Sequence, residues 1–435
     1  MRRFQLNNSG LIASLAIVAA IGCNGGGGTT TSTTTTGGAP STSTTGTTGS
    51  TAMRPAPTAA GNTATGNTIV VGMVSSLNGD LKPWGDDSAK GGQLAVEEFN
   101  KMNPDGIGGK KIDFRIADSN SKPEQGKSAA EKLMSDGAVA IIGEVASGIT
   151  AQMAKAAFDK GVPVIAVGAT RTDLTDIGTN VFRVCYTDAF QGPVMAKFAY
   201  DELSKKKAAI ITDIKQPYSV GLSQSFKDAF VKAGGTIVDE ESYNSGDTQF
   251  SGQLTKVKAA NPDVIFMSGY FNETGPLARQ ARDQGIGMDV PLLGGDGWDS
   301  REILNSGGAA ILGSFFCNHY NNKETRPEVT DFLKKWKAKY GTEPGTTMGA
   351  LGYDGTMLTL QSLKAAKGPD SKDLIDALEN TENFPGVSGS ISLKGMGGSP
   401  HKRALVVELT KDGQVFRKAY EWNDIYPATA APNTP

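Results

Sequence analysis

The residues best suited to chemistry lie in three short polar segments, each directly after an apolar run. The first follows Ile142 and opens a predicted helix, where Ser147 is the expected N-cap and free backbone amides could hold a carboxylate. The second, Gly168-Ala169-Thr170, offers a hydroxyl, an amide and a free carbonyl. In the third, Asp296 lies between glycines that allow close approach of a ligand, and its carboxylate could pair with an ammonium group. Alone, each segment is also compatible with an ordinary cap or turn.

Catalytic motifs are not evident in the sequence. The two histidines, His319 and His401, are far apart, and we expect both to be incidental surface or hinge residues. We find no nucleophile elbow, phosphate-binding loop or His-Glu-x-x-His motif. The glycine-rich stretch 106–109 precedes a strand, whereas a dinucleotide loop leads from a strand into a helix. The sequence therefore predicts a protein that is not an enzyme and that needs no metal or cofactor.

The elements that must position these residues alternate between strand and helix from residue 68 to about 422. Short apolar strands between helices indicate parallel sheets covered on both faces. The first run has strands expected at 69–74, 112–117, 138–142 and 162–167, with helices at 88–101, 123–135 and 150–160. The second has strands expected at 208–211, 236–238, 264–267 and 291–293. Because a chain of 435 residues exceeds one core of the usual size, the predicted fold class is α/β with two doubly wound parallel-sheet lobes.

The pattern changes after Gly313. Helices are expected over 329–340 and 348–366. Strands are expected at 391–393, 404–409 and 415–420, and Asp412-Gly413 marks a hairpin turn between the last two.

The first 23 residues are typical of an export signal. Arg2 and Arg3 precede an apolar run over 11–21, which is too short for the ~20 residues that a membrane-spanning helix needs. The following Ala20-Ile21-Gly22-Cys23 resembles a bacterial lipoprotein lipobox, in which the cysteine takes the lipid; the alternative is an ordinary secretory signal with a chance cysteine. Residues 24–67 are almost wholly Gly, Ser, Thr, Ala and Pro, which predicts a disordered tether.

The globular part resembles the type I periplasmic binding proteins, in particular the leucine/isoleucine/valine-binding proteins of branched-chain amino acid ABC transporters. The resemblance covers nearly all of residues 67–421. Each landmark is weak alone, but the ordered series is specific. The landmarks are 78–85, 141–143, 168–170, 183–193, 216–218, 269–270 and 277–285.

The resemblance implies how the ends of an amino acid would be held. Its carboxylate would meet Ser147 and the Thr170 amide, and its ammonium would meet the Thr170 hydroxyl, the Gly168 carbonyl and the Asp296 carboxylate. A second set of positions would frame the ligand's side chain or line the cleft. These are Trp84, Val145, Ala146, Ala169, Asp188, Tyr218 and Tyr270.

The chain also departs from the family pattern. Asp296 stands where the family usually has the longer glutamate, and Glu144 adds a charge that we expect near the pocket mouth. Around Met348 the family often has an aromatic residue. Asn120 and Ala146 occupy the places of the family disulfide in the first lobe. These differences leave the shape of the pocket, and so the accepted side chain, open.

The resemblance further implies three chain crossings between lobes, near 185–190, 314–320 and 384–390. The predicted organisation is a signal peptide over 1–23, a linker over 24–67, a first lobe from 68–187 and 318–386, a second lobe from 188–317 and 387–426, and a loose tail over 427–435. Cys185 and Cys317 fall on two crossings, where they could form a disulfide or remain separate buried thiols.

The implied partners are a small amino acid, an ABC permease in the membrane and the lipid on Cys23 of a monomeric protein in the periplasm or cell envelope. A formal net charge of −2 gives no indication of nucleic acid as a partner. Two alternatives stay open: a ligand such as an amide, urea or an aromatic acid, and a role as the sensing subunit of a receptor.

Overall fold

The computed structural model describes residues 54–427. The predicted signal peptide, Cys23, the tether before residue 54 and the tail from residue 428 lie outside the described residues. No helix in the described part of the chain combines the length and apolar character needed to cross a membrane.

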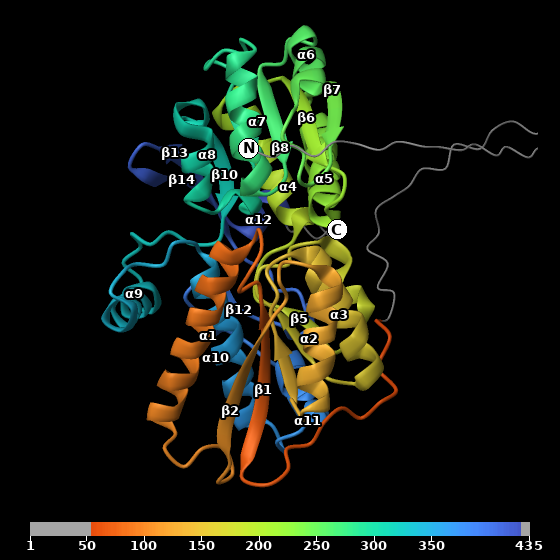
Figure 1. Cartoon of the computed structure of the whole chain (residues 1–435), viewed down its shortest axis with the longest axis vertical. Coiled ribbons are helices and arrows are strands. Elements are labelled where there is room, and N and C mark those ends of the chain that lie inside the picture. The colour runs from red at the N-terminus through yellow and green to blue at the C-terminus, as the bar shows by residue number, and fades with distance from the viewer. Residues whose placement is uncertain (1–53, 428–435) are drawn as a thin grey trace, which may run out of the picture. The chain divides into compact units, whose positions relative to one another are not determined.

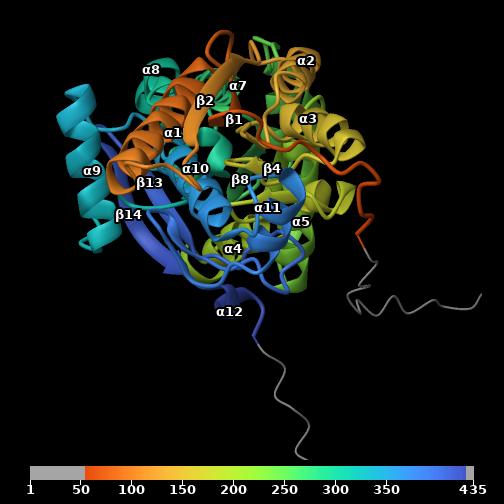
Figure 2. The ribbon, with the colours of Figure 1, turned by 90° about the horizontal axis from the view of Figure 1, so that it is seen from below.

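The first sheet is entirely parallel, and its strands lie in the order β2-β1-β3-β4-β5. The paired helices α1 and α10 cover one of its faces, and α2 and α3 cover the other (Figures 1 and 2). The continuous apolar runs of β3 and β4 are buried on both faces for this reason. The elements are β1 (Thr68–Ser75), α1 (Lys82–Met102), β2 (Lys111–Asp118), α2 (Pro123–Ser135), β3 (Ala140–Ile142), α3 (Ser147–Lys160), β4 (Val164–Ala166) and β5 (Val181–Arg183).

The second sheet repeats this order in β7-β6-β8-β9-β10 and adds an antiparallel hairpin, β13-β14, beside β10. The two runs of the sequence therefore do fold on one plan, as the alternating pattern predicted. The elements are α4 (Asp188–Lys197), β6 (Lys207–Asp213), α5 (Pro217–Lys232), β7 (Thr236–Tyr243), α6 (Ser251–Ala259), β8 (Val264–Ser268), α7 (Phe271–Asp283), β9 (Leu292–Gly294), α8 (Glu302–Gly307), β10 (Phe315–Asn318), β13 (Ala404–Thr410) and β14 (Gly413–Tyr420).

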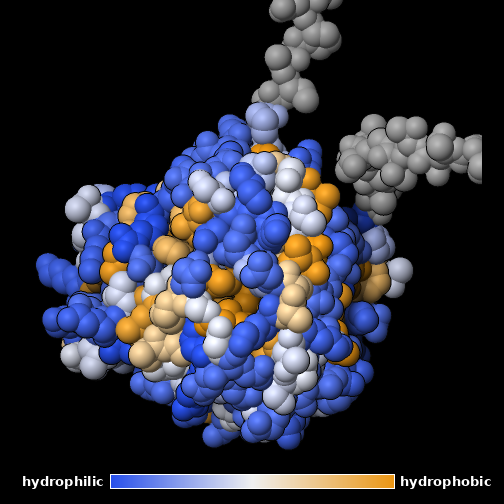
Figure 3. Space-filling model, turned by 90° about the horizontal axis from the view of Figure 1, so that it is seen from above, coloured by the Kyte–Doolittle hydropathy of each residue, from blue (hydrophilic) through white to orange (hydrophobic). Residues whose placement is uncertain are grey.

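The chain between β10 and β13 returns to the first sheet, where α10 lies along α1. The remaining elements are α9 (Pro327–Tyr340), α10 (Met348–Ala365), α11 (Ser371–Glu379), the small hairpin β11 (Phe384–Gly386) and β12 (Gly389–Ile391), and α12 (Trp422–Ile425). Hydrophilic residues cover most of the face seen in Figure 3, while the apolar side chains fill the interior. The exact lobe boundaries given above remain predictions.

Residues 54–67 form an ordered strap on the first lobe, although the composition predicted disorder through residue 67. At one end of the strap, the Arg54 guanidinium donates to three backbone carbonyls between residues 175 and 181. The guanidinium also lies 5.9 Å from the ring centre of Phe182. The prediction of a disordered tether is therefore wrong for this part of the chain.

Farther along the strap, Asn62 makes the second anchor. Its side-chain amide donates to the carbonyls of Met134 and Ala138, at 2.8 Å each, and its backbone amide donates to the Ser371 hydroxyl. Composition failed here because hydrogen bonds to main-chain carbonyls, and not apolar burial, hold the segment in place.

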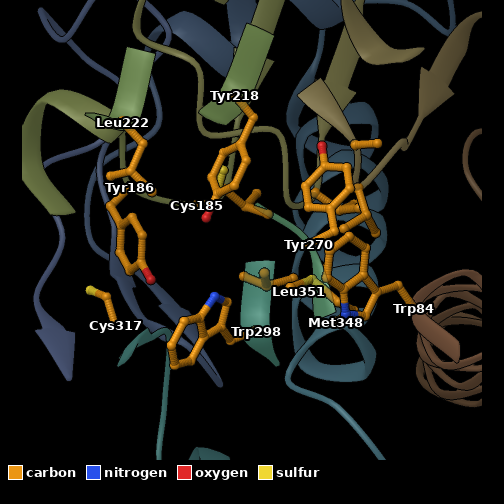
Figure 4. Packing of buried hydrophobic residues seen from close by; sticks show 14 of the residues in the cluster. Trp84, Cys185, Tyr186, Tyr218, Leu222, Tyr270, Trp298, Cys317, Met348 and Leu351 are labelled. Atoms are coloured by element: carbon orange, nitrogen blue, oxygen red, sulfur yellow. The ribbon is translucent and has the colours of Figure 1, made fainter. Parts of the chain in front are cut away.

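The two cysteines of the described chain are free thiols, and both are buried. Cys185 donates to the Ala169 carbonyl at 3.5 Å, whereas Cys317 lies beside the ring of Tyr186 (Figure 4). Burial raises the pKa of Cys185 to about 12. Of the two outcomes left open by the sequence, the structure has the separate buried thiols.

Candidate functional site

The candidate site residues follow the carboxyl ends of strands in both sheets. Because parallel strands end at one edge of a sheet, this arrangement gathers residues that are far apart in the sequence. All of the side chains concerned are buried. Trp84 follows β1, Val145 to Ser147 follow β3, Gly168 to Thr170 follow β4, Asp188 follows β5, Tyr218 follows β6, Tyr270 follows β8 and Asp296 follows β9.

The start of α3 differs in detail from the prediction. Ala146, not Ser147, is the N-cap, and Ser147 is the first helical residue. The Ser147 hydroxyl instead accepts a hydrogen bond from the Arg171 amide at 3.2 Å. Ser147 is replaced as the cap because the preceding backbone is already held by a carboxylate, that of Glu144.

We expected Glu144 at the mouth of the pocket, and that prediction is wrong. The side chain is buried beneath this turn. One of its carboxylate oxygens accepts from the backbone amides of Val145 and Ala146, at 2.8 and 2.9 Å. The other accepts from the hydroxyls of Ser76 and Ser119. Burial raises the pKa of Glu144, while these hydrogen bonds act in the opposite direction. Its role is to shape the turn that leads into α3.

A hydrogen-bonded network surrounds Asp296. The side-chain nitrogen of Gln191 lies 2.9 Å from Asp296 Oδ1, 2.8 Å from Asp188 Oδ1 and 3.4 Å from the Thr170 hydroxyl. The side-chain carbonyl oxygen of Gln191 accepts a hydrogen bond from the Asp296 backbone amide at 3.1 Å. On the other side, His319 Nε2 lies 3.0 Å from Asp296 Oδ2. Three oxygen acceptors thus converge on one nitrogen, which is the arrangement that suits an ammonium group.

The two carboxyl groups in this network affect each other's charge. Burial, with a contribution from the nearby Asp296, raises the pKa of Asp188 to about 7, although hydrogen bonds from Thr170 and Gln191 favour the ionised form. Two buried like charges cannot both be ionised cheaply. The site therefore favours a cationic group, which would relieve the repulsion.

Aromatic rings from both lobes lie beside this network. Trp84 of the first lobe meets Tyr270 edge-on with ring centres 5.0 Å apart, and Tyr218 stacks on Tyr270 at 5.3 Å (Figure 4). Tyr218 is fixed because its hydroxyl accepts from the Gly297 amide at 2.9 Å. These rings offer an apolar surface next to the acidic groups.

Gly168 is closely packed against two side chains of the first lobe. A Cβ atom at this position would lie 2.9 Å from Val145 Cγ1 and 3.1 Å from Met348 Sδ, so a side chain there would collide with both. Met348, around which the family resemblance suggested an aromatic residue, lies next to Gly168 at this point. The carbonyl of Ala169 already accepts a hydrogen bond from the Arg183 guanidinium at 2.9 Å and is therefore engaged within the protein.

Several buried polar atoms around the site have no hydrogen-bond partner among the described residues. They are Asp188 Oδ2, Ser219 Oγ, Tyr270 Oη and His319 Nδ1. Buried polar atoms are nearly always hydrogen-bonded in folded proteins, and each such atom is a place where a polar ligand could supply the missing partner.

A surface pocket of about 510 Å³ lies beside this cluster, between residues 171–173 of the first lobe and 214–221 of the second. It adjoins the site at two points. The Arg171 amide bonds Ser147, and a Cβ atom on Gly221 would lie 3.9 Å from Asp188 Oδ2.

A family model described as Periplasmic binding protein matches residues 68–414. This chain belongs to the periplasmic binding protein family. The match includes every predicted contact residue and both sheets up to the start of β14.

Relatives of this periplasmic binding protein agree in sequence and fold. It is 36% identical over 283 residues to Leu/Ile/Val-binding protein homolog 3 of Brucella melitensis, covering 65% of this chain and 75% of that protein. The structure of a leucine-binding protein from Thermotoga maritima is 31% identical with a TM-score of 0.77, covering 82% of this chain and all of the other. A branched-chain amino acid transporter substrate-binding protein from Streptococcus pneumoniae, solved in complex with isoleucine, is 32% identical with a TM-score of 0.74, covering 81% and 99%.

Sequence reasoning missed two residues of this site. Gln191 appeared only as a landmark, and His319 was expected to be incidental, yet both bond Asp296 directly. One signal could have revealed His319: it directly follows β10, the strand that takes the place of β5 in the repeated order. Asp188 closely follows β5, so the two residues occupy related places in the two lobes.

Proposed function

We propose that this protein is the extracytoplasmic solute-binding component of an ABC transporter and that it binds a branched-chain amino acid. One observation carries the proposal: acceptor oxygens of Thr170, Asp188 and Asp296 converge on a single buried nitrogen, beside an apolar wall of aromatic rings. Such a site suits an ammonium group attached to an apolar side chain. Relatives named for leucine, isoleucine and valine support the choice of ligand.

In this proposal the two ends of the amino acid meet different lobes. The carboxylate lies at the start of α3, near Ser147 and Thr170, where the positive end of the helix dipole and exposed amides favour an anion. The ammonium lies against Asp296 and Asp188, and the side chain lies against Tyr218, Tyr270 and Trp84. A ligand that touches both lobes favours the state in which they are closed, and a permease can recognise that state.

The finer points of location and assembly belong to the proposal as well. Family membership implies a place outside the cytoplasm, and the lipobox-like sequence at Cys23 supports a lipid anchor. We infer a monomer that binds its solute without converting it.

Calorimetric titration tests the function. We expect L-leucine, L-isoleucine or L-valine to bind, and we expect benzoate, urea and acetamide to bind much more weakly because they lack an amine for the acidic pair. Asp296→Ala should weaken amino acid binding by about 2–5 kcal/mol, since it removes a buried charge partner. The control is Asp412→Ala in the exposed turn between β13 and β14, which should bind like the wild type. Binding of benzoate without binding of amino acids would favour the aromatic-acid alternative.

A further inference from the structure

His319 lies at the junction of the site and a predicted crossing between the lobes. It directly follows β10, and its backbone amide donates to the Asn318 side chain at 2.8 Å. Asn318 is itself held by Thr347 and Asp299, at 2.9 and 3.2 Å. The imidazole is fully buried and stacks on the ring of Tyr186, with ring centres 4.1 Å apart. Both its backbone and its ring are therefore fixed.

From this fixed position His319 contacts the carboxylate of Asp296. Its Nε2 lies 3.0 Å from Oδ2, while the amide of Gln191 bonds Oδ1 at 2.9 Å. With the tautomer that carries hydrogen on Nε2, the imidazole donates to the carboxylate, and each oxygen of Asp296 has its own donor. The carboxylate can then neither rotate nor withdraw.

The shape of the Asp296 loop explains why such a clamp is useful. Asp296 begins a helical turn of only three residues. Cβ atoms at the flanking positions 295 and 297 would lie within 3 Å of neighbouring atoms, so neither glycine leaves room for a side chain that could support Asp296. The orientation of the carboxylate must therefore be set by side chains from other elements.

Packing alone does not account for a histidine here. A residue that only filled this buried space would be expected to be apolar, because an imidazole brings two polar nitrogens that must find partners. Nε2 finds Asp296, but Nδ1 has no partner among the described residues. The histidine is thus retained at the cost of one buried polar atom without a partner, and the group it bonds belongs to the proposed ligand site.

We propose that His319 is a positioning residue for Asp296 and that it sets the preference of the site for amine-bearing solutes over matched solutes without an amine. The inference rests on the proposed function. His319 holds Oδ2 so that Oδ1 faces the Gln191 nitrogen, on which oxygens of Asp188 and Thr170 also converge. Without the imidazole, the carboxylate turns away from the place of the ammonium, while the carboxylate end and the apolar end of the ligand keep their contacts.

The test compares two ligands that differ in one group: L-leucine and its 2-hydroxy analogue, (S)-2-hydroxy-4-methylpentanoate. Calorimetry on His319→Leu should show L-leucine binding weakened by about 10- to 100-fold, as expected for loss of a hydrogen bond to a buried charged group. Binding of the hydroxy acid should change by less than about threefold, because its hydroxyl gains little from an oriented anion.

Two further variants make the result specific. His319→Gln retains an N–H donor and should recover part of the affinity for L-leucine. His401→Leu, outside the cluster, should leave both affinities unchanged. The ratio of L-leucine to L-valine affinity should stay constant in His319→Gln, because both amino acids present the same ammonium group.

Each remaining outcome overturns the inference. If the His319 variants lose affinity for L-leucine and for the hydroxy acid by the same factor, the residue only supports the fold. The same holds if the ratio of L-leucine to L-valine affinity changes. If His319→Leu binds L-leucine like the wild type, His319 does not position Asp296. If the wild type binds no amino acid, the proposed function fails first, which is a distinct result.

Discussion

Asp188 and Asp296 bring two carboxyl groups into one buried space, where one amide nitrogen bonds both. Without a ligand, the least costly state leaves one carboxyl protonated, as the pKa of about 7 for Asp188 indicates. An ammonium group beside the pair would favour the ionised form of both and so lower that pKa.

A proton is therefore expected to leave the protein when an amino acid binds. Near pH 6.5, calorimetric enthalpies measured in buffers of different ionisation enthalpy should differ, corresponding to release of up to about one proton per ligand. Affinity should rise as pH rises toward 7, because less work is then needed to remove the proton. Asp188→Asn should abolish both effects. Buffer-independent enthalpies for the wild type would contradict a shared site for the ammonium and Asp188.

The same carboxyl group has a consequence for stability. The folded chain without ligand keeps a proton on Asp188 that the unfolded chain, with an ordinary pKa near 3.8, has already released. The contribution of this group to the free energy of unfolding is thus fully present below about pH 4 and is lost as pH rises through about 7.

Some residues of this site could be identified from the sequence, and others could not. Asp296 was identifiable because flanking glycines after an apolar run are a local signal. His319 was harder to identify, because its indication, a place directly after the strand that corresponds to β5, depends on the strand order and not on a local pattern. Ser147 was assigned to the cap because serine favours that position, and the buried carboxylate of Glu144 could not be anticipated.

At the scale of elements, the strap of residues 54–67 shows how a segment without large apolar residues can still be ordered. It crosses the ends of several elements of the first lobe and satisfies carbonyls that those elements leave free. Alternating strands and helices were predictable from apolar runs, whereas the strap was not, because its partners are backbone atoms and leave no trace in composition.

Asn62→Ala tests the strap. The change removes the donor for the carbonyls of Met134 and Ala138 and should lower the free energy of unfolding by about 1–3 kcal/mol. Denaturant titration followed by circular dichroism measures the difference. Thr65→Ala, at an exposed position of the same strap, is the control and should change little. Equal stability of the two variants would mean that the Asn62 anchor contributes nothing to folding.

At the scale of the whole described chain, several direct hydrogen bonds join the predicted lobes near the site, and two of them involve residues close to the aromatic rings. The indole nitrogen of Trp84 donates to the Asp299 carbonyl at 2.7 Å, and the side chain of Asn272 donates to the Asp80 carbonyl at 3.1 Å. Trp84 has two roles here, because its ring also packs against Tyr270. The pairing of lobes was predictable from the repeated pattern, but these contacts between them were not.

Trp84→Phe separates the two roles. Phenylalanine keeps an aromatic ring but lacks the donor, so the closed state should lose about 0.5–1.5 kcal/mol and L-leucine should bind several-fold more weakly. The melting temperature without ligand should be nearly unchanged, since each lobe keeps its own core. Trp422→Phe, in α12, is the matched control with no expected effect on binding. Unaltered affinity in Trp84→Phe would show that this bond does not contribute to closure.

The position of Trp84 also gives the molecule an internal optical reporter. Of the four tryptophans in the chain, Trp84 is the one whose indole nitrogen bonds across the lobes, whereas Trp298 bonds the Met267 carbonyl within the second lobe. Separation of the lobes would expose the indole of Trp84 to water and remove its acceptor. Its emission should therefore follow opening and closing directly, in the unlabelled protein and on the timescale of the motion itself.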